Sequence, residues 1–484
     1  MKKVLLLLFV FLNFPNRAQR PNVIYVLTDQ WRSDAFGYAG NKVVKTPNID
    51  SFSSEAIIFR NAVSVCPVCT PYRASLMTGK YPTSTGMFLN DLYLPEKELC
   101  MAEIYKSAGY QTAYYGKWHL DGHGRINNVQ PYRRQGFDYW KALECSHDYN
   151  NMPYYENNDP EIKYWKKYSP FAIAEDAGDY LEELSKNNDP FLLFISFESP
   201  HFPHLTAPEE YKMLYPPSEL TFDKNVTEDK FPGIRKELQG YYAHCTATDK
   251  AFGLLIEKIK KYGLYDNSII IFTSDHGEMM GSHGIRPTEK QMAWNESVRI
   301  PFLIRYPGIH ANKGSDIFTP LNTPDILPTM LSLSGIKIPH CIEGEDLSPL
   351  IRNPGKQKDR VALFMSVSPF ARTPFTEYRG IRTIQYTYVE TPGEATMLFD
   401  NTADPGQMNN LAGNPESKKL HNKMSGLLQK KLKEIGDADF KTRQFYIEKW
   451  GFQPGEGGAI PYSIVAGKEY IVQTPKKSAL DTVK

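Results

Sequence analysis

Apolar residues in the first three hundred positions gather in short runs, and each run ends in polar side chains. The clearest runs are residues 22–27, 110–115, 191–197 and 268–274. Both faces of these runs are apolar, which is typical of strands buried on both sides in a parallel sheet. Helical patterns lie between them, at residues 100–109, 173–186 and 248–263. Strands that alternate with helices predict an α/β fold whose large, mixed but mostly parallel sheet is flanked by helices.

The polar residues that follow these four runs are chemically versatile. They are Asp29 after the first run, Lys117 and His119 after the second, His201 after the third, and Asp275 with His276 after the fourth. Ligands of open α/β sheets bind beyond the carboxyl ends of the strands. Aspartate and histidine also end strands simply as turn residues, but four such ends together favour one shared site.

The pattern changes after about residue 355. Residues 380–400 predict a β-hairpin with a Pro-Gly loop, and residues 415–436 predict an amphipathic helix. We therefore expect a catalytic α/β domain at residues 19–355 and a smaller C-terminal α+β subdomain at residues 356–484. The turn-rich end of this subdomain is expected to wrap the surface.

Composition describes an ordinary globular protein, with 484 residues of which 41% are hydrophobic and 23% are charged. The formal net charge of +1 gives no support for binding to nucleic acid or to a membrane through bulk charge. Aromatic residues make up 13% of the chain, and the exposed members of such a set suit stacking on ligands.

The N-terminus has the pattern of a secretory signal peptide. Two lysines precede an apolar run that is too short for a membrane span and that breaks at residues 13–15, and Ala18 offers a cleavage site. No later stretch is long and apolar enough to cross a bilayer. We expect residues 1–18 to be removed and the protein to be exported, either to the periplasm or outside the cell.

Six cysteines include a close pair, Cys66 and Cys69, in the stretch VCPVCTPYRASLMTGKYP at residues 65–82. A C-x-x-C pair serves in redox chemistry or as half of a zinc site. Zinc would need a second ligand pair, which does not recur, and a thioredoxin-type pair would follow the first strand directly. Pro71 and Gly79 instead delimit a short helix that starts near Cys69. The helix dipole and Arg73 then favour an oxyanion against residue 69.

The segment C-x-P-x-R followed by L-x-T-G-K resembles the signature of the sulfatase family, within the alkaline phosphatase superfamily. Six further segments resemble family segments in the same order: PNVIYVLTDQWRSD, GYQTAYYGKWHLDG, SFESPHFPH, FTSDHGEMMGSHG, EKQMAWNESVRIPFLIRYPG and LFDNTADPGQMNNLA. The resemblance implies an alkaline phosphatase-like fold. It also implies that a maturation enzyme oxidises Cys69 to formylglycine (3-oxoalanine), whose hydrate attacks sulfur and later expels the sulfate.

The resemblance also implies roles for the matching residues. The expected catalytic residues are Cys69, Arg73, Lys117, His119, His201 and Lys290, and the expected metal ligands are Asp29, Gln30, Cys69, Asp275 and His276. Lysines would hold sulfate oxygens as compact point charges. His201, together with Lys290, would protonate the leaving oxygen, and His119 would take a proton from the nucleophile. Oxygen ligands favour Ca²⁺ or Mg²⁺ over zinc, and the family favours Ca²⁺.

Three positions depart from the family pattern. Tyr72 stands where a serine that helps maturation is usual, Gln30 stands where a second aspartate is frequent, and His276 stands where an asparagine is frequent. The first departure bears on the conversion of Cys69, and the other two bear on metal affinity.

The sequence therefore predicts hydrolysis of a sulfate ester, and export and aromatic content favour a sulfated carbohydrate as substrate. Candidate substrate-binding residues are His123, His147 and His204, beside arginines such as Arg125. Two alternatives stay open. One is a phosphonate monoester or phosphodiester hydrolase of the same superfamily, and the other is a catalytically silent carbohydrate-binding relative.

Overall fold

The computed structural model describes residues 20–187, 189–310, 312–369, 377–392 and 394–452. The expected signal segment and most of the expected wrapping tail lie outside these ranges. Within them, no helix has the length and apolar character needed to cross a membrane.

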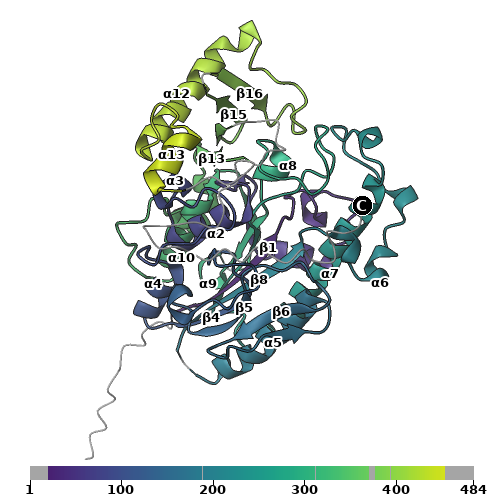
Figure 1. The fold of residues 1–484 in the computed structure, drawn as a ribbon, viewed down its shortest axis with the longest axis vertical. Coiled ribbons are helices and arrows are strands. Elements are labelled where there is room, and N and C mark those ends of the chain that lie inside the picture. Colours follow the sequence, from purple (N-terminus) through teal and green to yellow (C-terminus); the bar gives the residue numbers. More distant parts are fainter. Residues whose placement is uncertain (1–19, 188, 311, 370–376, 393, 453–484) are drawn as a thin grey trace, which may run out of the picture.

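A ten-stranded sheet forms the centre of the protein (Figure 1). In spatial order its strands are β11 (Ser315–Ile317), β2 (Ile57–Phe59), β10 (Phe302–Arg305), β9 (Ser268–Ser274), β1 (Asn22–Asp29), β8 (Phe191–Pro200), β4 (Gln111–Lys117), β5 (Tyr139–Leu143), β6 (Met152–Glu156) and β7 (Lys163–Trp165). The five strands from β9 to β5 run parallel, whereas β10 and β6 pair antiparallel with this group. The predicted mixed, mostly parallel sheet is confirmed.

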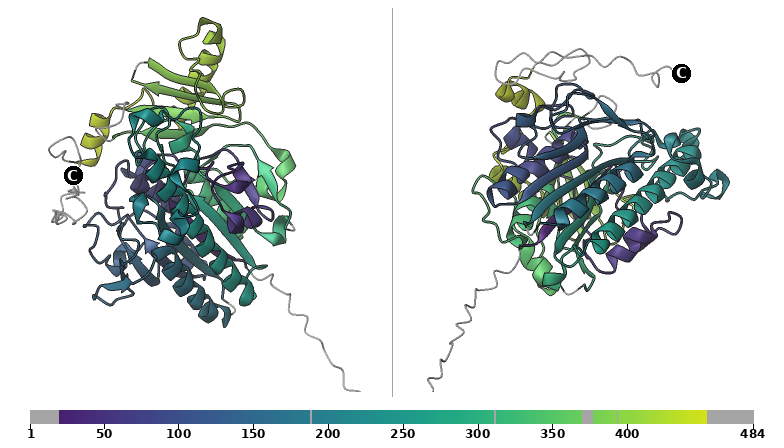
Figure 2. Two further views of the ribbon diagram at one scale, coloured as in Figure 1. Left: turned by 90° about the vertical axis from the view of Figure 1, so that its right-hand side faces the viewer. Right: turned by 90° about the horizontal axis from the view of Figure 1, so that it is seen from below.

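Helices cover both faces of this sheet, as Figure 2 shows. One face is covered by α1 (Pro47–Ser53), α5 (Ser169–Ser185) and α7 (Ile234–Lys261), and the other by α2 (Cys69–Thr78), α4 (Met101–Ser107) and α10 (Thr323–Leu333). Strand β1 illustrates why both faces must be apolar. Val23, Tyr25 and Leu27 pack in the core beneath α2, while Ile24 and Val26 pack in the core beneath α7.

The predicted helices are present, and one of them, α7, is much longer than predicted. Helix α7 starts at Ile234, fourteen residues before the predicted start at 248. Its first half carries Gly240, where a Cβ would lie 2.3 Å from the carbonyl oxygen of His204. Glycine is a poor helix former in isolation, so the sequence pattern gave little sign of a helix there. The close packing against His204 nevertheless requires glycine at position 240.

The C-terminal part is a four-stranded antiparallel sheet with two helices, at the top of Figure 1. It comprises β13 (Ala362–Ser366), β14 (Tyr378–Arg382), β15 (Tyr386–Thr391), β16 (Glu394–Asp400), α12 (Lys418–Glu434) and α13 (Arg443–Trp450). The predicted hairpin at 380–400 corresponds to β15 and β16 together with the end of β14. Leu363, Met365 and Ile381 belong to the same hydrophobic core as α2, so this sheet shares one core with the helical layer that contains α2. The boundary at residue 355 stays a prediction.

The remaining strands and α-helices of the described residues are short. They are β3 (Ala62–Val63), which pairs with β12 (Leu321–Asn322), and the helices α3 (Pro82–Thr85), α6 (Glu209–Lys212), α8 (Asn295–Val298), α9 (Pro307–His310) and α11 (Ser348–Arg352).

Candidate active site

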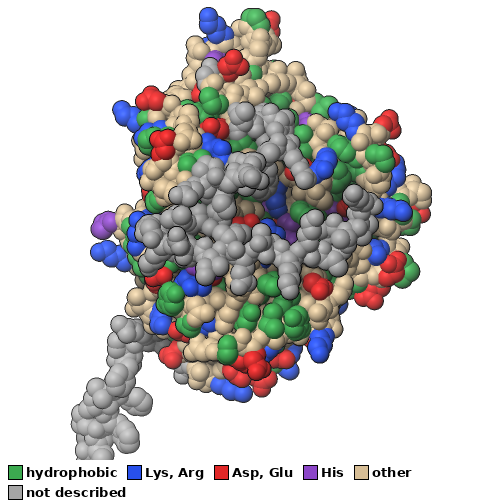
Figure 3. Space-filling view, viewed as in Figure 1, with side chains coloured by type: hydrophobic (Ala, Val, Ile, Leu, Met, Phe, Trp, Pro, Cys, Tyr) green, Lys and Arg blue, Asp and Glu red, His purple; other side chains and the backbone are tan. Residues whose placement is uncertain are grey.

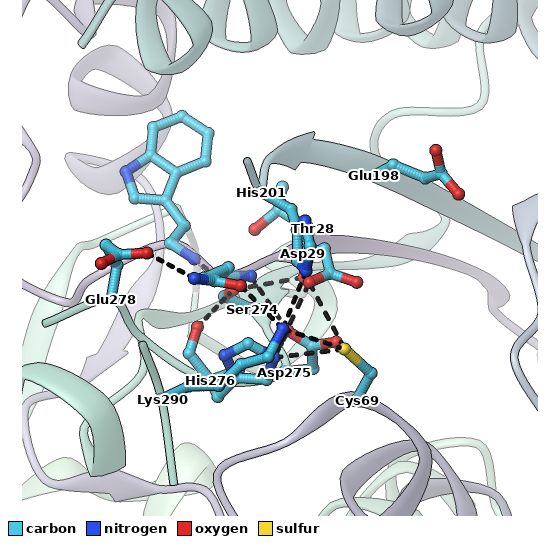
Figure 4. Close-up of polar contacts among 12 residues, drawn as sticks. Thr28, Asp29, Cys69, Glu198, His201, Ser274, Asp275, His276, Glu278 and Lys290 are labelled. Atoms are coloured by element: carbon cyan, nitrogen blue, oxygen red, sulfur yellow. Dashed lines mark hydrogen bonds and ion pairs between the residues drawn. The ribbon is translucent and has the colours of Figure 1, made fainter. Parts of the chain in front are cut away.

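Four adjacent strands bring the predicted polar ends to one place. In the sheet order β9-β1-β8-β4, Asp275 follows β9, Asp29 ends β1, His201 follows β8, and Lys117 ends β4. All four side chains are buried. Figure 4 shows Asp29, His201 and Asp275 converging with Cys69 and Lys290. The arrangement is the one expected at the carboxyl edge of a parallel sheet.

Helix α2 places Cys69 at this edge. The helix begins at Cys69 itself, after Val68 in an extended conformation, and ends at Thr78. Gly79 follows with φ 65°, a conformation that favours glycine. The Cys69 sulfur lies 3.8 Å from Nζ of Lys117, 3.7 Å from Nζ of Lys290 and 3.4 Å from Nε2 of His276. Burial raises the pKa of the thiol, but these three positive groups lower it well below its usual range.

Two buried aspartates share one guanidinium group. Nη2 of Arg73 lies 3.1 Å from Oδ2 of Asp29 and 3.2 Å from Oδ2 of Asp275, and Nζ of Lys117 donates to Oδ2 of Asp29 at 2.7 Å. Burial favours the neutral acid at both positions. At Asp29, however, the positive charges of Lys117 and Arg73 lower the pKa below its usual range. Burial and the charge of Asp29 raise the pKa of Asp275 to about 6.

The donor atoms around these aspartates fit a divalent cation. One ligand atom each from Asp29, Cys69, Asp275 and His276 lies within 4.8 Å of all the others. Nδ1 of His276 interacts with the carbonyl oxygen of Gly277 at 2.9 Å, so Nε2 faces the aspartates. Two buried carboxylates this close repel one another, and a dication between them would remove the repulsion.

Gln30 is oriented toward the same point. Its amide nitrogen donates to Glu278 and, at 3.2 Å, to the carbonyl oxygen of Thr288. Its Oε1 accepts from Nζ of Lys290 at 2.8 Å. The buried carboxylate of Glu278 is itself fixed by the backbone N–H groups of Met280 and Thr288. Glu278 therefore decides which end of the Gln30 amide faces the site.

His119 and Asp91 form a carboxylate–imidazole pair. Nε2 of His119 lies 2.8 Å from Oδ1 of Asp91, whose Oδ2 accepts from Arg125 at 3.1 Å. Nδ1 of His119 is buried and has no hydrogen-bond partner in the described ranges. Burial lowers the pKa of His119, but Cys145, Asp91 and Cys69 raise it more, to about 10.

His201 and Lys290 form a second proton-sharing pair. Nζ of Lys290 lies 2.8 Å from Nε2 of His201, and Nδ1 of His201 lies 2.7 Å from the carbonyl oxygen of Phe202. A carbonyl only accepts, so Nδ1 carries a hydrogen, and Nε2 is left to accept from the ammonium group. Burial and the charge of Lys290 hold the pKa of His201 well below its usual range. The geometry thus places the shared proton on Lys290.

A cavity of about 460 Å³ opens above these groups. Lys117, His119, His201, Lys290 and Cys69 line its inner part, and Asn90, Arg125 and Arg286 also border it. On the face drawn in Figure 3, Lys, Arg and His side chains are visible near the centre between the grey segments, with acidic side chains beside them.

The structure brings together every predicted catalytic and metal-binding residue, but separates the substrate-binding candidates. His147 lines the cavity, with its ring stacked on that of His201 at 4.2 Å between centroids. His123 and His204 are not among the residues that border the cavity. His204 lies 2.9 Å from Glu237, and the ring of His123 packs edge-on against Tyr93.

Sequence reasoning missed two residues of the site, Asp91 and Glu278. Glu278 lies three positions after Asp275, so its closeness to a predicted ligand was the available signal. Asp91 lies in a loop without a recognised motif, and nothing in the sequence linked it with His119.

Comparison with known proteins gives concordant results. A family model described as sulfatase matches residues 21–336, and one described as N-sulphoglucosamine sulphohydrolase, C-terminal, matches residues 281–434. An ulvan-active sulfatase of Formosa agariphila is 58% identical over 458 residues, which cover 94% of this chain and 89% of the relative.

Solved structures share the fold. One was determined in complex with its substrate D-glucosamine-2-N,6-O-disulfate and superimposes with a TM-score of 0.76 at 25% identity, covering 87% of this chain and 99% of the other. The phosphonate monoester hydrolase of Agrobacterium radiobacter superimposes with a TM-score of 0.67 at 21% identity, covering 91% and 99%. At this identity the second likeness is one of fold alone.

Proposed function

The chain belongs to the sulfatase family, and we propose that it removes sulfate from a sulfated polysaccharide or oligosaccharide in the cavity that contains Cys69. One observation carries the proposal. The helix that starts at Cys69 places this residue within 4 Å of two lysine ammonium groups, at the floor of a cavity open to a ligand. As a sulfuric ester hydrolase, the protein needs this concentration of positive charge around a nucleophile.

The substrate class follows from the relatives. The relative at 58% identity is named for activity on ulvan, and a solved relative binds a disulfated glucosamine. A cavity of about 460 Å³ has room for a sugar unit, and polar groups border it. We therefore assign a sulfated carbohydrate rather than an aryl or alkyl sulfate.

Cys69 is proposed as the precursor of formylglycine, whose hydrate supplies a nucleophilic hydroxyl. Cys69, Tyr72 and Arg73 are all buried in the folded protein. A maturation enzyme therefore has to act before the chain folds. Tyr72 packs in the hydrophobic core around α2, so its size is accommodated by the fold.

A calcium ion is the proposed metal, since the ligand set is dominated by oxygen atoms. Asp29, Asp275 and Oε1 of Gln30 would hold it, with position 69 and His276 at its edge. When bound, the ion neutralises charge on the sulfate and favours ionisation of a neighbouring hydroxyl. Arg73 bridges the two aspartates and keeps both side chains oriented.

Two pairs are proposed to move protons. Asp91 holds His119 through Nε2. Conversion of Cys69 removes one of the groups that raise the pKa of His119, and Nδ1 of the neutral imidazole then takes a proton from the group at position 69. On the other side, Lys290 supplies the proton and His201 relays it to the leaving oxygen of the sugar. The expectation that His201 is the acid is thus refined, because its imidazole is held neutral in the folded protein.

Lys117 and Lys290 are proposed to hold the sulfate oxygens. Lys117 donates to Oδ2 of Asp29, and Lys290 donates to Oε1 of Gln30. Each ammonium has further hydrogens for a substrate oxygen. Lys117 ends β4, whereas Lys290 lies in the loop between β9 and α8, so the two ammonium groups reach Cys69 from different elements and would hold different sulfate oxygens.

Export to the periplasm or outside the cell remains part of the proposal. It is supported by the signal-like pattern of residues 1–18. The partners of the chain are then the polysaccharide and a formylglycine-generating enzyme.

The proposal is tested by comparing kcat/KM of matured enzyme on a sulfated ulvan oligosaccharide, an aryl sulfate and an aryl phosphonate. We expect the oligosaccharide to be the best of the three. A preference for the phosphonate over both sulfates would favour the phosphonate monoester hydrolase alternative instead.

A further inference from the structure

A second group of metal-binding side chains lies in the wall of the same cavity. It consists of Cys145, His147 and Glu198, which offer one sulfur, one nitrogen and one oxygen atom within 4.8 Å of one another. Figure 4 shows Glu198 set apart from the residues around Cys69 and Asp275, with no drawn contact between them. The mechanism proposed above uses none of the three side chains.

The main chain holds this group together. Cys145 lies two residues beyond β5 and Glu198 lies near the end of β8, and both strands flank β4. The backbone N–H of Ser146 donates to Oε1 of Glu198 at 2.7 Å. This bond ties the loop that carries His147 to β8. Within the loop, Sγ of Cys145 lies 3.7 Å from Nε2 of His147.

Two atoms of the group lack partners although they are buried. Oε2 of Glu198 and Nδ1 of His147 make no hydrogen bond to any residue that the structure describes, and Glu198 is only 1% exposed. Burial raises the pKa of Glu198 to about 7 and lowers that of His147 to about 4. Buried polar atoms are normally satisfied, and a cation that coordinates the Glu198 carboxylate would satisfy it.

The donor types select the kind of metal. A thiolate and an imidazole with one carboxylate suit Zn²⁺ and similar thiophilic ions, whereas the oxygen-rich set around Asp29 suits Ca²⁺. Cys145 and His147 line the cavity, so the fourth coordination position faces it. We propose that Cys145, His147 and Glu198 form a second metal site, specific for a thiophilic divalent ion such as Zn²⁺, and that its occupation inhibits the enzyme.

The inhibition follows from the contact between two rings. The ring of His147 stacks on that of His201 with centroids 4.2 Å apart and planes 8° apart. A dication bound to His147 would add positive charge beside His201, which must carry a proton during the reaction. It would also occupy space that the sugar needs. This part rests on the proposed function, whereas metal binding does not.

Binding is a simple exchange of a proton for a metal bond. The thiol of Cys145 releases its proton to solvent as the sulfur–metal bond forms, and Glu198, whose pKa is raised to about 7, releases any proton that it carries when its oxygen binds the metal. Glu198 and His147 contribute lone pairs. No electron is transferred, so no oxidant or reductant is needed.

The binding test uses cobalt as a spectroscopic substitute for zinc. Full-length Cys69→Ala protein, saturated with calcium, keeps Cys145 as the thiol of the cavity and is catalytically silent. Titration with Co²⁺ should produce the thiolate-to-cobalt charge-transfer absorption. The band should disappear when Cys145→Ser is added to this background, and it should persist with Cys341→Ser, which removes an exposed thiol.

Zinc affinity is then measured by competition with a chromophoric chelator in the same variants. Mutation of a residue that only hydrogen-bonds to a metal ligand weakens metal binding by about 10- to 100-fold. Loss of a direct ligand such as Cys145 should weaken zinc binding by at least as much. Glu198→Gln keeps an acceptor for Ser146 and should also weaken binding. A cobalt band that survives Cys145→Ser, or zinc affinity equal in all variants, would overturn the site.

The inhibition test needs active enzyme. It therefore uses protein without the Cys69→Ala change, in which Cys69 has been converted to formylglycine. The zinc concentration that halves the rate on a sulfated oligosaccharide should rise about tenfold or more in Cys145→Ser, relative to that variant's own uninhibited rate. Equal inhibition of both proteins would overturn the inhibitory role. Absence of sulfatase activity without zinc would count against the proposed function and leave the cobalt result unaffected.

Discussion

The carboxylate of Asp91 lies 2.8 Å from Nε2 of His119, and both residues adopt positive φ angles, 61° for Asp91 and 60° for His119. Such conformations are unfavourable for residues other than glycine. The fold therefore maintains two strained backbones whose side chains meet beside Cys69. The contact directs the free Nδ1 of His119, which the proposed mechanism uses as a base.

Replacing Asp91 by asparagine should impair this base. Because Asp91 raises the pKa of His119, Asp91→Asn should shift the acid limb of the pH profile of kcat to lower pH. The maximal kcat should fall by about tenfold or more, a part of the 10²–10⁴ that proton transfer contributes. Asp138→Asn, which removes a surface ion pair with Lys106, is the control and should leave both unchanged. An unaltered profile in Asp91→Asn would exclude the orienting role.

Calcium affinity should fall as pH drops below about 6. The pKa of Asp275 is raised to about 6 in the metal-free protein, so at lower pH calcium has to displace a proton from this carboxyl group. Isothermal titration in two buffers of different ionisation enthalpy should detect that proton release. Asp275→Asn should bind calcium more weakly and without this pH dependence, whereas the surface variant Asp316→Asn should behave as wild type. Stoichiometric zinc instead of calcium between Asp29 and Asp275 would contradict the assignment.

The decrease in kcat/KM caused by losing His201 should depend on the leaving group of the substrate. A sugar alcohol leaves poorly and needs a proton, whereas an aryl alcohol needs little help. His201→Ala should therefore lower kcat/KM by about 10²-fold or more on a sulfated sugar and by much less on an aryl sulfate. The exposed His340→Ala serves as control. Equal losses on the two substrates would remove His201 from the proton relay.

The sequence predicted the parts of the site that follow from strand ends and motifs. Asp29, Lys117 and His201 end or follow strands that are apolar on both faces, and the parallel order of these strands places their ends together. Cys69 was predictable because a proline and a glycine delimit its helix. These features are local, so they are visible in a short stretch of chain.

Features that depend on distant contacts were not predictable. Asp91 reaches His119 because the two loops are joined through the backbone, where the N–H of Leu94 donates to the carbonyl oxygen of Leu120 at 2.9 Å. No sequence pattern near Asp91 indicates that these two loops are joined. The edge strand β11 and its neighbour β2 have three residues each, too few to show a periodicity. Their place is set by pairing with β10 and with each other.

Replacement of Cys66 and replacement of Cys69 should differ sharply in their effect on activity. Cys66 is buried, and burial raises the pKa of its thiol to about 12, which suits a packed, unreactive side chain. Cys66→Ala should keep most of the activity, with kcat measured per converted chain. Cys69→Ala should have none. Activity in Cys69→Ala with loss in Cys66→Ala would reverse the assignment.

The central claim is that formylglycine at position 69 performs the hydrolysis, and one measurement tests it directly. Preparations made with different amounts of a formylglycine-generating enzyme will differ in the converted fraction, which peptide mass spectrometry of residues 65–82 reports. Sulfate release from a sulfated oligosaccharide is measured on each preparation. We predict that the rate rises in proportion to the converted fraction and extrapolates to zero for unconverted protein. Full activity in chains that retain the Cys69 thiol would contradict the account.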